Sequence, residues 1–341
     1  MEHNATNTTV QVKLEQLRDV AQAALAKAGC DDVNAAAVAG VMTLAERDGC
    51  PSHGLFRLPG YLASLKSGKV AGSARPAIAQ LAPSVVQIDG RRGFAPLAVA
   101  AARQALTPVA HSQGIAAAAI VNVYHFSALW ADIEPLVEQG LAALCFTAYM
   151  PAVAPAGAAT PFFGTNPMAF GWPRAGGNTM IFDQASAAMA RGEIMLAARD
   201  GHALPQGVGI DAAGQPTIDP AEILKGAQLP FGGYKGSAIA LMVELLCAGL
   251  IGQPFSVEAA EEDNRDGGPP RGGVLILALD PARFGDANAW TAHSESFLQR
   301  LSGLEGVRLP GDRRVKNRER IAREGVTLPV KLWEEALLAS R

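Results

Sequence analysis

The chain has 341 residues, of which 49% are apolar and 18% charged, so it can bury a substantial core and lacks the composition of a disordered protein. Its 29 basic and 32 acidic side chains give a net charge of −3. That balance lacks the excess of basic residues that binds a phosphate backbone, and we expect no nucleic-acid partner.

Three features of the sequence bear on the cellular location of the protein: its first residues, its cysteines and its longest apolar run. Residues 1 to 9 are polar, so we expect a frayed tail and no signal peptide. The four cysteines form no CxxC pair, which favours reduced thiols and a cytoplasmic location. The longest apolar run, residues 237–252, contains Glu244 and is too short to span a bilayer. We therefore expect no membrane partner.

Helices and strands are predicted to alternate along the chain, which is typical of an α/β fold. Two helices at residues 12–28 and 32–47 come first, followed by a Pro-Ser-His-Gly break within residues 49–54. The predicted elements after this break are strand 85–89, helix 96–112, strand 115–121, helix 127–139, strand 141–149, a long loop at 151–167, strands 168–172 and 180–183, helix 187–199, a buried helix at 236–252, a mobile surface loop at 257–273, a buried strand at 274–279 and helices from about residue 286.

Helical ends around an α/β middle predict that the two termini form one joint helical layer. We expect three parts: a helical terminal domain of residues 10–70 plus 305–341, an α/β domain of 75–180 plus 272–304, and a smaller domain of 181–271. No GxGxxG follows a strand, and no GxxxxGK[ST], HExxH or GxSxG is present. No two histidines have ligand spacing, so we expect no zinc.

The break after the second helix carries the first candidate site. His53 lies there between Ser52 and Gly54, whose backbone freedom allows close approach. Arg57 and Tyr61 follow at i and i+4, on one helical face. An imidazole can move one proton and a guanidinium can pair with a carboxylate, so these side chains would suit an organic acid. The alternatives are that Ser52 and His53 cap a helix and that Arg57 is solvated.

Two strand ends carry further candidates. His125 stands where a strand passes into a helix, with Ser127 as a possible cap, and such a helix start can accept a pyrophosphate. A buried histidine bonded to the backbone is the alternative. Asp183 closes an apolar strand and Glu193 follows in the sequence RGEI. Either carboxyl could orient an imidazole or a ribose hydroxyl, or be a surface acid.

Two glycine-containing turns are rich in cations. The sequence PFGGYKG at 230–236 places three glycines and Lys235 before a helix, which favours an anion-binding nest. The sequence RLPGDRR at 308–314 sets three arginines around a glycine. This second turn is either a solvated helix start or a phosphate clamp.

At these positions the chain resembles the type-2 malate/L-lactate dehydrogenase family, whose members bind NAD(P) with a non-Rossmann α/β fold. The motifs that carry the resemblance, in chain order, are AERDGCPSHGLFRLPGY, HFSALW, FGTNPMAFG, FDQAS, ALPQGVGID, PFGGYKGSAIALMVELL and RLPGDRR. Within the family they are most similar to the branch that reduces Δ1-piperideine-2-carboxylate and Δ1-pyrroline-2-carboxylate with NADPH, giving L-pipecolate and L-proline.

The resemblance implies that His53 is the proton donor, with Ser52 beside it and Glu193 completing the relay where imine-reducing relatives carry aspartate. Arg57 and Tyr61 would contact the substrate. The implied cofactor-binding residues are Arg57, His125, Phe126, Ser127, Ala128, Leu129, Thr165, Asp183, Gln184, Ala185, Lys235, Arg308, Gly311, Asp312, Arg313 and Arg314.

The resemblance also implies a homodimer and places the cofactor on the α/β domain. NADPH is favoured over NADH because the arginines of residues 308–314 could neutralise a 2′-phosphate. An alternative within the same family is an NAD(P)-dependent dehydrogenase of a 2-hydroxy acid such as malate, lactate or ureidoglycolate.

Overall fold

The computed structural model describes residues 9–177 and 179–341. The predicted tail of residues 1 to 9 lies outside this range except for Thr9, which begins a strand. Among the described residues, no helix combines the length and apolar character needed to cross a membrane.

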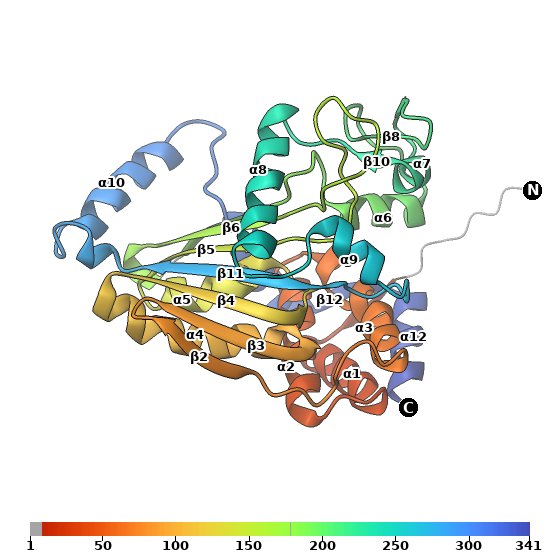
Figure 1. Cartoon of the computed structure of the whole chain (residues 1–341), viewed down its shortest axis with the longest axis horizontal. Helices are drawn as coiled ribbons and strands as arrows, with labels where there is room; N and C mark the ends of the chain where they lie inside the picture. Colours follow the sequence, from red (N-terminus) through yellow and green to blue (C-terminus); the bar gives the residue numbers. More distant parts are fainter. Residues whose placement is uncertain (1–8, 178) are drawn as a thin grey trace, which may run out of the picture.

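A mixed seven-stranded sheet forms the middle of the molecule (Figure 1). In spatial order its strands are β2 (Ala77–Ala82), β3 (Val85–Phe94), β4 (Ile115–Tyr124), β11 (Arg271–Leu279), β5 (Ala142–Thr147), β6 (Met168–Pro173) and β7 (Thr179–Gln184). Only β3 and β4 run parallel. Because β11 lies between β4 and β5, its residues from Val274 to Leu277 are apolar without alternation. The predicted α/β class is confirmed.

Two helices cover one face of this sheet, α4 (Ala95–Gln113) and α5 (Leu129–Glu138). Small side chains on α4 and β4, such as Ala98, Ala102 and Ala118, are fully buried and let the helix approach the strands closely. Larger side chains, including Leu106 and Ile133, fill the rest of this core.

The opposite face carries α8 (Tyr234–Glu244), a π-helical turn (Leu245–Gly249) and α9 (Ser256–Glu262), with α10 (Trp290–Ser302) farther along the sheet (Figure 1). The prediction that the helix at 236–252 is buried is wrong for one of its faces. Val243 and Cys247 pack against β11, but Leu245 is 53% exposed and Leu250 is 67% exposed. An all-apolar sequence does not distinguish the packed face of a helix from an uncovered one.

The mobile surface loop predicted at 257–273 also needs correction. Its first residues belong to α9 and its last to β11, so only residues 263–270 between them lack regular structure. Asp263 and Asp266, which the composition suggested to be solvated, are buried against Lys69.

The two ends of the chain pack together. β1 (Thr9–Val12) pairs with β12 (Val326–Pro329), and α1 (Leu14–Lys27) packs against α12 (Val330–Ser340), so the helix predicted from residue 12 starts later than expected. With α2 (Asp32–Arg47), α3 (Leu58–Lys66) and α11 (Asp312–Glu324), they enclose a core that includes Leu17, Met42, Tyr61, Leu328 and Trp333.

A smaller group of elements completes the fold. It comprises α6 (Arg191–Asp200), α7 (Pro220–Lys225), β8 (Gly209–Ile210), β9 (Pro216–Thr217) and β10 (Ala227–Gln228). Ile194, Val208 and Ile223 form its own core. These separate cores support the three-part division, which stays a prediction.

The loop predicted at 151–167 is confirmed: it contains no named helix or strand.

Candidate active site

A cavity of about 1080 Å³ brings together segments that lie far apart in the sequence. This is the size of a ligand-binding cleft. It is lined by parts of residues 49–57, 125–130, 147–150, 165–167, 183–196 and 308–314, together with Leu224, Phe231 and Gly267.

The loop that follows α2 presents His53 to the cavity. Ser52 Oγ lies 3.1 Å from His53 Nδ1, and the Ser52 carbonyl accepts a 2.7 Å hydrogen bond from Arg57 Nε. Burial lowers the pKa of His53 to about 3, and the charges of Arg57 and His125 contribute to the decrease. The imidazole is therefore neutral at pH 7 in the free protein.

A carboxyl group lies directly behind this loop. Glu46, on α2, is 4% exposed, and its Oε1 accepts a 2.8 Å hydrogen bond from the Leu55 backbone N–H. The loop lies close to this carboxyl at Gly54, where a Cβ would lie 2.1 Å from Glu46 Oε1 and would force the glutamate side chain to move. Burial raises the pKa of Glu46 to about 7. Glu46 thus supports the backbone on which His53 stands.

Replacing Glu46 by glutamine should change how stability depends on pH. Its folded pKa of about 7 lies above the unfolded value of 4.5, so its contribution to the free energy of unfolding is full below pH 4.5 and is lost as the pH rises toward 7. Between these pH values the free energy of unfolding of the wild type should fall as the pH rises. Glu46→Gln should make the slope of that free energy against pH less negative by up to about 1.4 kcal/mol per pH unit. Urea unfolding at several pH values measures this. Glu222→Gln, in an exposed ion pair, is the control, and equal slopes for Glu46→Gln and wild type would contradict the assignment.

Two arginines, Arg57 and Arg191, line the cavity and have no carboxylate partner in the described ranges. The Arg57 guanidinium lies 4.4 Å from the centre of the Phe126 ring. Arg191 is the first residue of α6, and a Cβ on the next residue, Gly192, would lie 2.8 Å from Ser52 Cβ and 2.9 Å from the Arg57 guanidinium. Burial lowers the pKa of both arginines. Unpaired cations in a cleft favour an anionic ligand.

Sequence reasoning missed Arg191. It stands in the sequence RGEI, where only Glu193 was selected. The available signal was a cation at a helix N-terminus, where the helix dipole disfavours positive charge. Tyr149, in the loop that follows β5, lines the cavity and was missed as well, and no sequence pattern marks it.

His125 is paired with a carboxylate rather than with the backbone. Its Nε2 lies 2.7 Å from Asp132 Oδ2 and 3.2 Å from Ser127 Oγ. Both side chains of the His125–Asp132 pair are buried, at 7% and 1% exposed. The imidazole therefore has a fixed orientation at the cavity wall.

The two candidate relay acids differ in their surroundings. Asp183 accepts a 3.1 Å hydrogen bond from the Trp130 backbone N–H, so one amide at the start of α5 is already used. Burial raises the pKa of Asp183 to about 6. Glu193 is exposed and lines the cavity. Neither carboxyl is hydrogen-bonded to His53 among the residues that the structure describes, so the relay stays a prediction.

The turn at residues 308–314 carries arginines of two kinds. Arg314 donates a 2.5 Å hydrogen bond to the Ile181 carbonyl and lies over the Trp130 ring at 5.1 Å. Arg308 and Arg313 are exposed at the cavity and form no ion pair within the described part of the chain. Arg314 therefore anchors the turn, while the other two are available to an anion.

Three residues predicted for the site lie outside the cavity lining. Tyr61 is buried behind Phe126, with ring centres 5.5 Å apart. Arg57, in the 3-10 turn before α3, also packs on Phe126, with its guanidinium 4.4 Å from the ring centre, but of the two side chains Arg57 alone lines the cavity. Lys235 is exposed on the first turn of α8, and nothing in the sequence specifies how far that turn lies from the cavity. The Asp312 carboxylate accepts from the Leu309 N–H instead, at 3.1 Å.

The other predicted residues do line the cavity. They are Ser52, His53, Arg57, His125, Phe126, Ser127, Ala128, Leu129, Thr165, Asp183, Gln184, Ala185, Glu193, Arg308, Gly311, Arg313 and Arg314. Their common location supports one site that contains the imidazole of His53 and the exposed guanidinium of Arg308.

Comparison with known proteins agrees with this arrangement. The family model for malate/L-lactate dehydrogenase matches residues 12–336. A Δ1-pyrroline-2-carboxylate reductase of Ancylobacter novellus is 48% identical over 96% of this chain and 96% of its own length. A Δ1-pyrroline-2-carboxylate/Δ1-piperideine-2-carboxylate reductase of Pseudomonas aeruginosa is 44% identical over 96% of this chain and 98% of its own length.

Among solved structures, the crystal structure of Δ1-piperideine-2-carboxylate reductase from Pseudomonas syringae pvar. tomato has a TM-score of 0.92 and 43% identity, covering 97% of this chain and 99% of that one. The match of sequence and fold thus extends over the whole cavity and all the segments that line it. The chain belongs to the malate/L-lactate dehydrogenase family.

Proposed function

We propose that the protein uses NADPH to reduce the cyclic imino acids Δ1-pyrroline-2-carboxylate and Δ1-piperideine-2-carboxylate to L-proline and L-pipecolate. The names of its relatives support this activity. The observation that carries it is that Arg57 and Arg191, both without a carboxylate partner among the described residues, adjoin Ser52 and His53 in one cavity.

The two arginines would bind the substrate carboxylate. A charged hydrogen bond contributes about 1.5 to 3 kcal/mol, and two of them would fix the orientation of the ring. The carboxylate would also offset the positive charge that lowers the pKa of His53. His53 would then take up a proton as the substrate binds and deliver it to the substrate nitrogen, with Ser52 holding Nδ1.

The remaining lining residues suit a dinucleotide. A reduced nicotinamide, when bound, supplies the hydride. Residues 125–129 before α5, residues 183–185 after β7 and the turn at 308–314 would hold the cofactor. We infer that this domain is not a Rossmann fold, because β3 and β4 are the only parallel pair in the described sheet and no glycine-rich motif follows β3.

A substrate panel tests the proposal. The fall in NADPH absorbance is followed with the five-membered and six-membered imino acids, with pyruvate and with oxaloacetate. Rapid consumption with the imino acids is expected. Faster turnover of an oxo acid would favour the 2-hydroxy acid alternative and overturn the proposal.

Arg313 should distinguish the two nicotinamide cofactors. The side chain is exposed at the cavity, where it could neutralise the 2′-phosphate. Arg313→Ala should raise the KM for NADPH about tenfold, the loss of one charged hydrogen bond, and leave the KM for NADH unchanged. Steady-state kinetics with both cofactors measure this, with Arg300→Ala on α10 as the control. An equal change for both cofactors would contradict the role.

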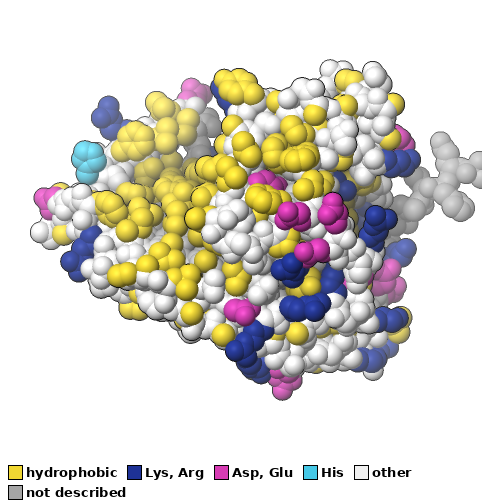
Figure 2. All heavy atoms as spheres, viewed as in Figure 1, with side chains coloured by type: hydrophobic (Ala, Val, Ile, Leu, Met, Phe, Trp, Pro, Cys, Tyr) yellow, Lys and Arg dark blue, Asp and Glu magenta, His cyan; other side chains and the backbone are white. Residues whose placement is uncertain are grey.

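We also propose that the protein is a cytoplasmic homodimer. Apolar side chains gather on the sheet face between α10 and α8 (Figure 2). Leu241, Leu245 and Leu250 near α8 and Phe297 on α10 are between 49% and 67% exposed. Large apolar side chains that are exposed together favour an interface with a second copy of the chain, which would bury them. Sedimentation at micromolar concentration should give twice the chain mass, and a monomer would contradict the proposal.

A further inference from the structure

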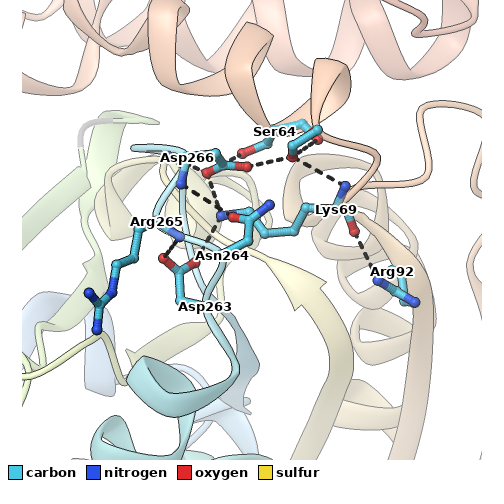
Figure 3. A network of polar contacts seen from close by, with 9 residues as sticks. Ser64, Lys69, Arg92, Asp263, Asn264, Arg265 and Asp266 are labelled. Carbon is cyan, nitrogen blue, oxygen red and sulfur yellow. Dashed lines mark hydrogen bonds and ion pairs between the residues drawn. The ribbon is translucent and has the colours of Figure 1, made fainter.

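A cluster of buried charges forms around Lys69 (Figure 3). Its side chains are outside the lining of the active-site cavity, and Lys69 and Asp263 line a separate cavity of about 550 Å³. The Lys69 ammonium donates a 2.9 Å hydrogen bond to Asp263 and a 2.6 Å hydrogen bond to Asp266. The three side chains are 7%, 3% and 9% exposed. Solvent and salt screen such buried contacts only weakly, so the cluster attaches the segment 263–268 firmly to the end of α3.

The same carboxylates organise the backbone of the segment. Asp266 accepts hydrogen bonds from Ser67 Oγ at 2.7 Å and from the Gly268 N–H at 2.9 Å. Asp263 accepts one from the Arg265 N–H at 2.8 Å. Burial by itself would raise the pKa of Asp266, but the hydrogen bonds from Lys69 and Ser67 outweigh it and lower the pKa. The segment is thus held as an ordered unit with Lys69 at its centre.

This unit reaches the cavity at Gly267. The backbone of Gly60, on α3, approaches the backbone of Gly267 closely: a Cβ on Gly60 would lie 2.9 Å from the Gly267 carbonyl oxygen. The same Cβ would lie 2.9 Å from Phe126 Cε1. Phe126 is the ring on which the Arg57 guanidinium lies. Gly267 therefore forms the cavity wall next to the arginine that would bind the substrate carboxylate.

The cluster also acts on the site electrostatically. Burial raises the pKa of Tyr149, which lines the cavity; the charges of Arg57 and Arg191 oppose this increase, and those of Asp263 and Asp266 add to it. These carboxylates therefore influence the substrate end of the cavity, although neither of them lines it.

We propose that Lys69 is a positioning residue for imino acid reduction. By holding Asp263 and Asp266 it fixes Gly267 as the wall beside Arg57, and so lowers the KM for the imino acid without touching substrate or cofactor. This inference rests on the proposed function. It assigns the cluster a role at the substrate end, distinct from the dinucleotide end at residues 308–314.

Lys69→Met tests the role, because it keeps the aliphatic stem and removes the ammonium. Two buried carboxylates are then left to repel each other, and the segment should leave α3. We expect the KM for Δ1-pyrroline-2-carboxylate to rise about tenfold, with less than about a threefold change in kcat and in the KM for NADPH. Lys69→Arg should restore most of the loss. Lys225→Met, in an exposed ion pair, is the matched control.

Limited digestion with trypsin gives a readout that does not depend on activity. Arg265 is exposed but lies between the two anchored aspartates, so cleavage after it should be slow while Lys69 holds them in place. Mass spectrometry should show faster cleavage after Arg265 in Lys69→Met than in wild type or Lys225→Met. Should Lys69→Met fail to fold, Ser67→Ala removes a single hydrogen bond to Asp266 and should shift KM and cleavage less, in the same direction.

The two readouts separate the possible failures. Unchanged cleavage would show that Lys69 does not hold the segment, whatever the kinetics. Faster cleavage with an unchanged KM would show that the segment does not shape the substrate site. Both results overturn the inference and leave the proposed function intact, whereas wild-type protein that turns over no imino acid overturns the proposed function and the positioning role with it.

Discussion

Replacing His53 by alanine should lower kcat for the imino acid by about 10²- to 10⁴-fold, the usual contribution of a positioned general acid. The imidazole is held by Ser52 at 3.1 Å, and no other histidine than His125 lines the cavity described here. His125 is engaged with Asp132 at 2.7 Å and should not replace it. Steady-state kinetics measure the loss, with unchanged NADPH binding and melting temperature as controls.

The loss should depend on the substrate. A cyclic imine is more basic than a ketone, so part of its activation can come from protonation in solution. His53→Ala should therefore reduce turnover less for Δ1-piperideine-2-carboxylate than for any oxo acid that the wild type accepts. An equal loss for both substrates would contradict this contribution from protonation of the imine in solution.

Arg57→Met should lower kcat/KM for the imino acid by about 10- to 150-fold, corresponding to about 1.5 to 3 kcal/mol for a charged hydrogen bond. The effect should appear mainly in KM, because the carboxylate is bound equally before and during hydride transfer. Arg57→Lys should recover only part of the affinity, since an ammonium does not form a bidentate pair.

Arg191→Met should act in the same direction, because the two guanidinium groups share the cavity. Arg199→Met, farther along α6 and paired with Asp200 at 2.7 Å, is the matched control. If neither Arg57→Met nor Arg191→Met changes the KM, the substrate carboxylate binds elsewhere.

Much of the fold could be predicted because local patterns reflect local structure. Apolar runs bounded by turns locate β4, β5 and β11, and the Pro-rich composition of residues 151–167 correctly predicts a segment without helix or strand. Local patterns in the sequence do not predict the spatial order of the strands in the sheet. β11 inserts between β4 and β5 through pairing across more than a hundred residues, and only the assembled sheet determines that position.

The site was predictable to a similar extent. Motifs place residue types along the chain, and residues 52–57, 125–129 and 308–314 do meet in one cavity. They do not specify side-chain direction, so Tyr61 was assigned to the site although it packs in the core. Arg191 was missed because its significance is the lack of a partner carboxylate in the described structure, a property that exists only after folding.

The pairing of β1 with β12 has a consequence for biosynthesis. The core beneath the His53 loop joins Leu17, Met42 and Leu55 to Leu328 and Trp333. A ribosome makes the first of these residues long before the last, so a nascent chain cannot complete this core until Leu328 and Trp333 have been synthesised. During that interval the early helices expose apolar surface, so the part of the polypeptide that is synthesised first is the part with most need of a chaperone.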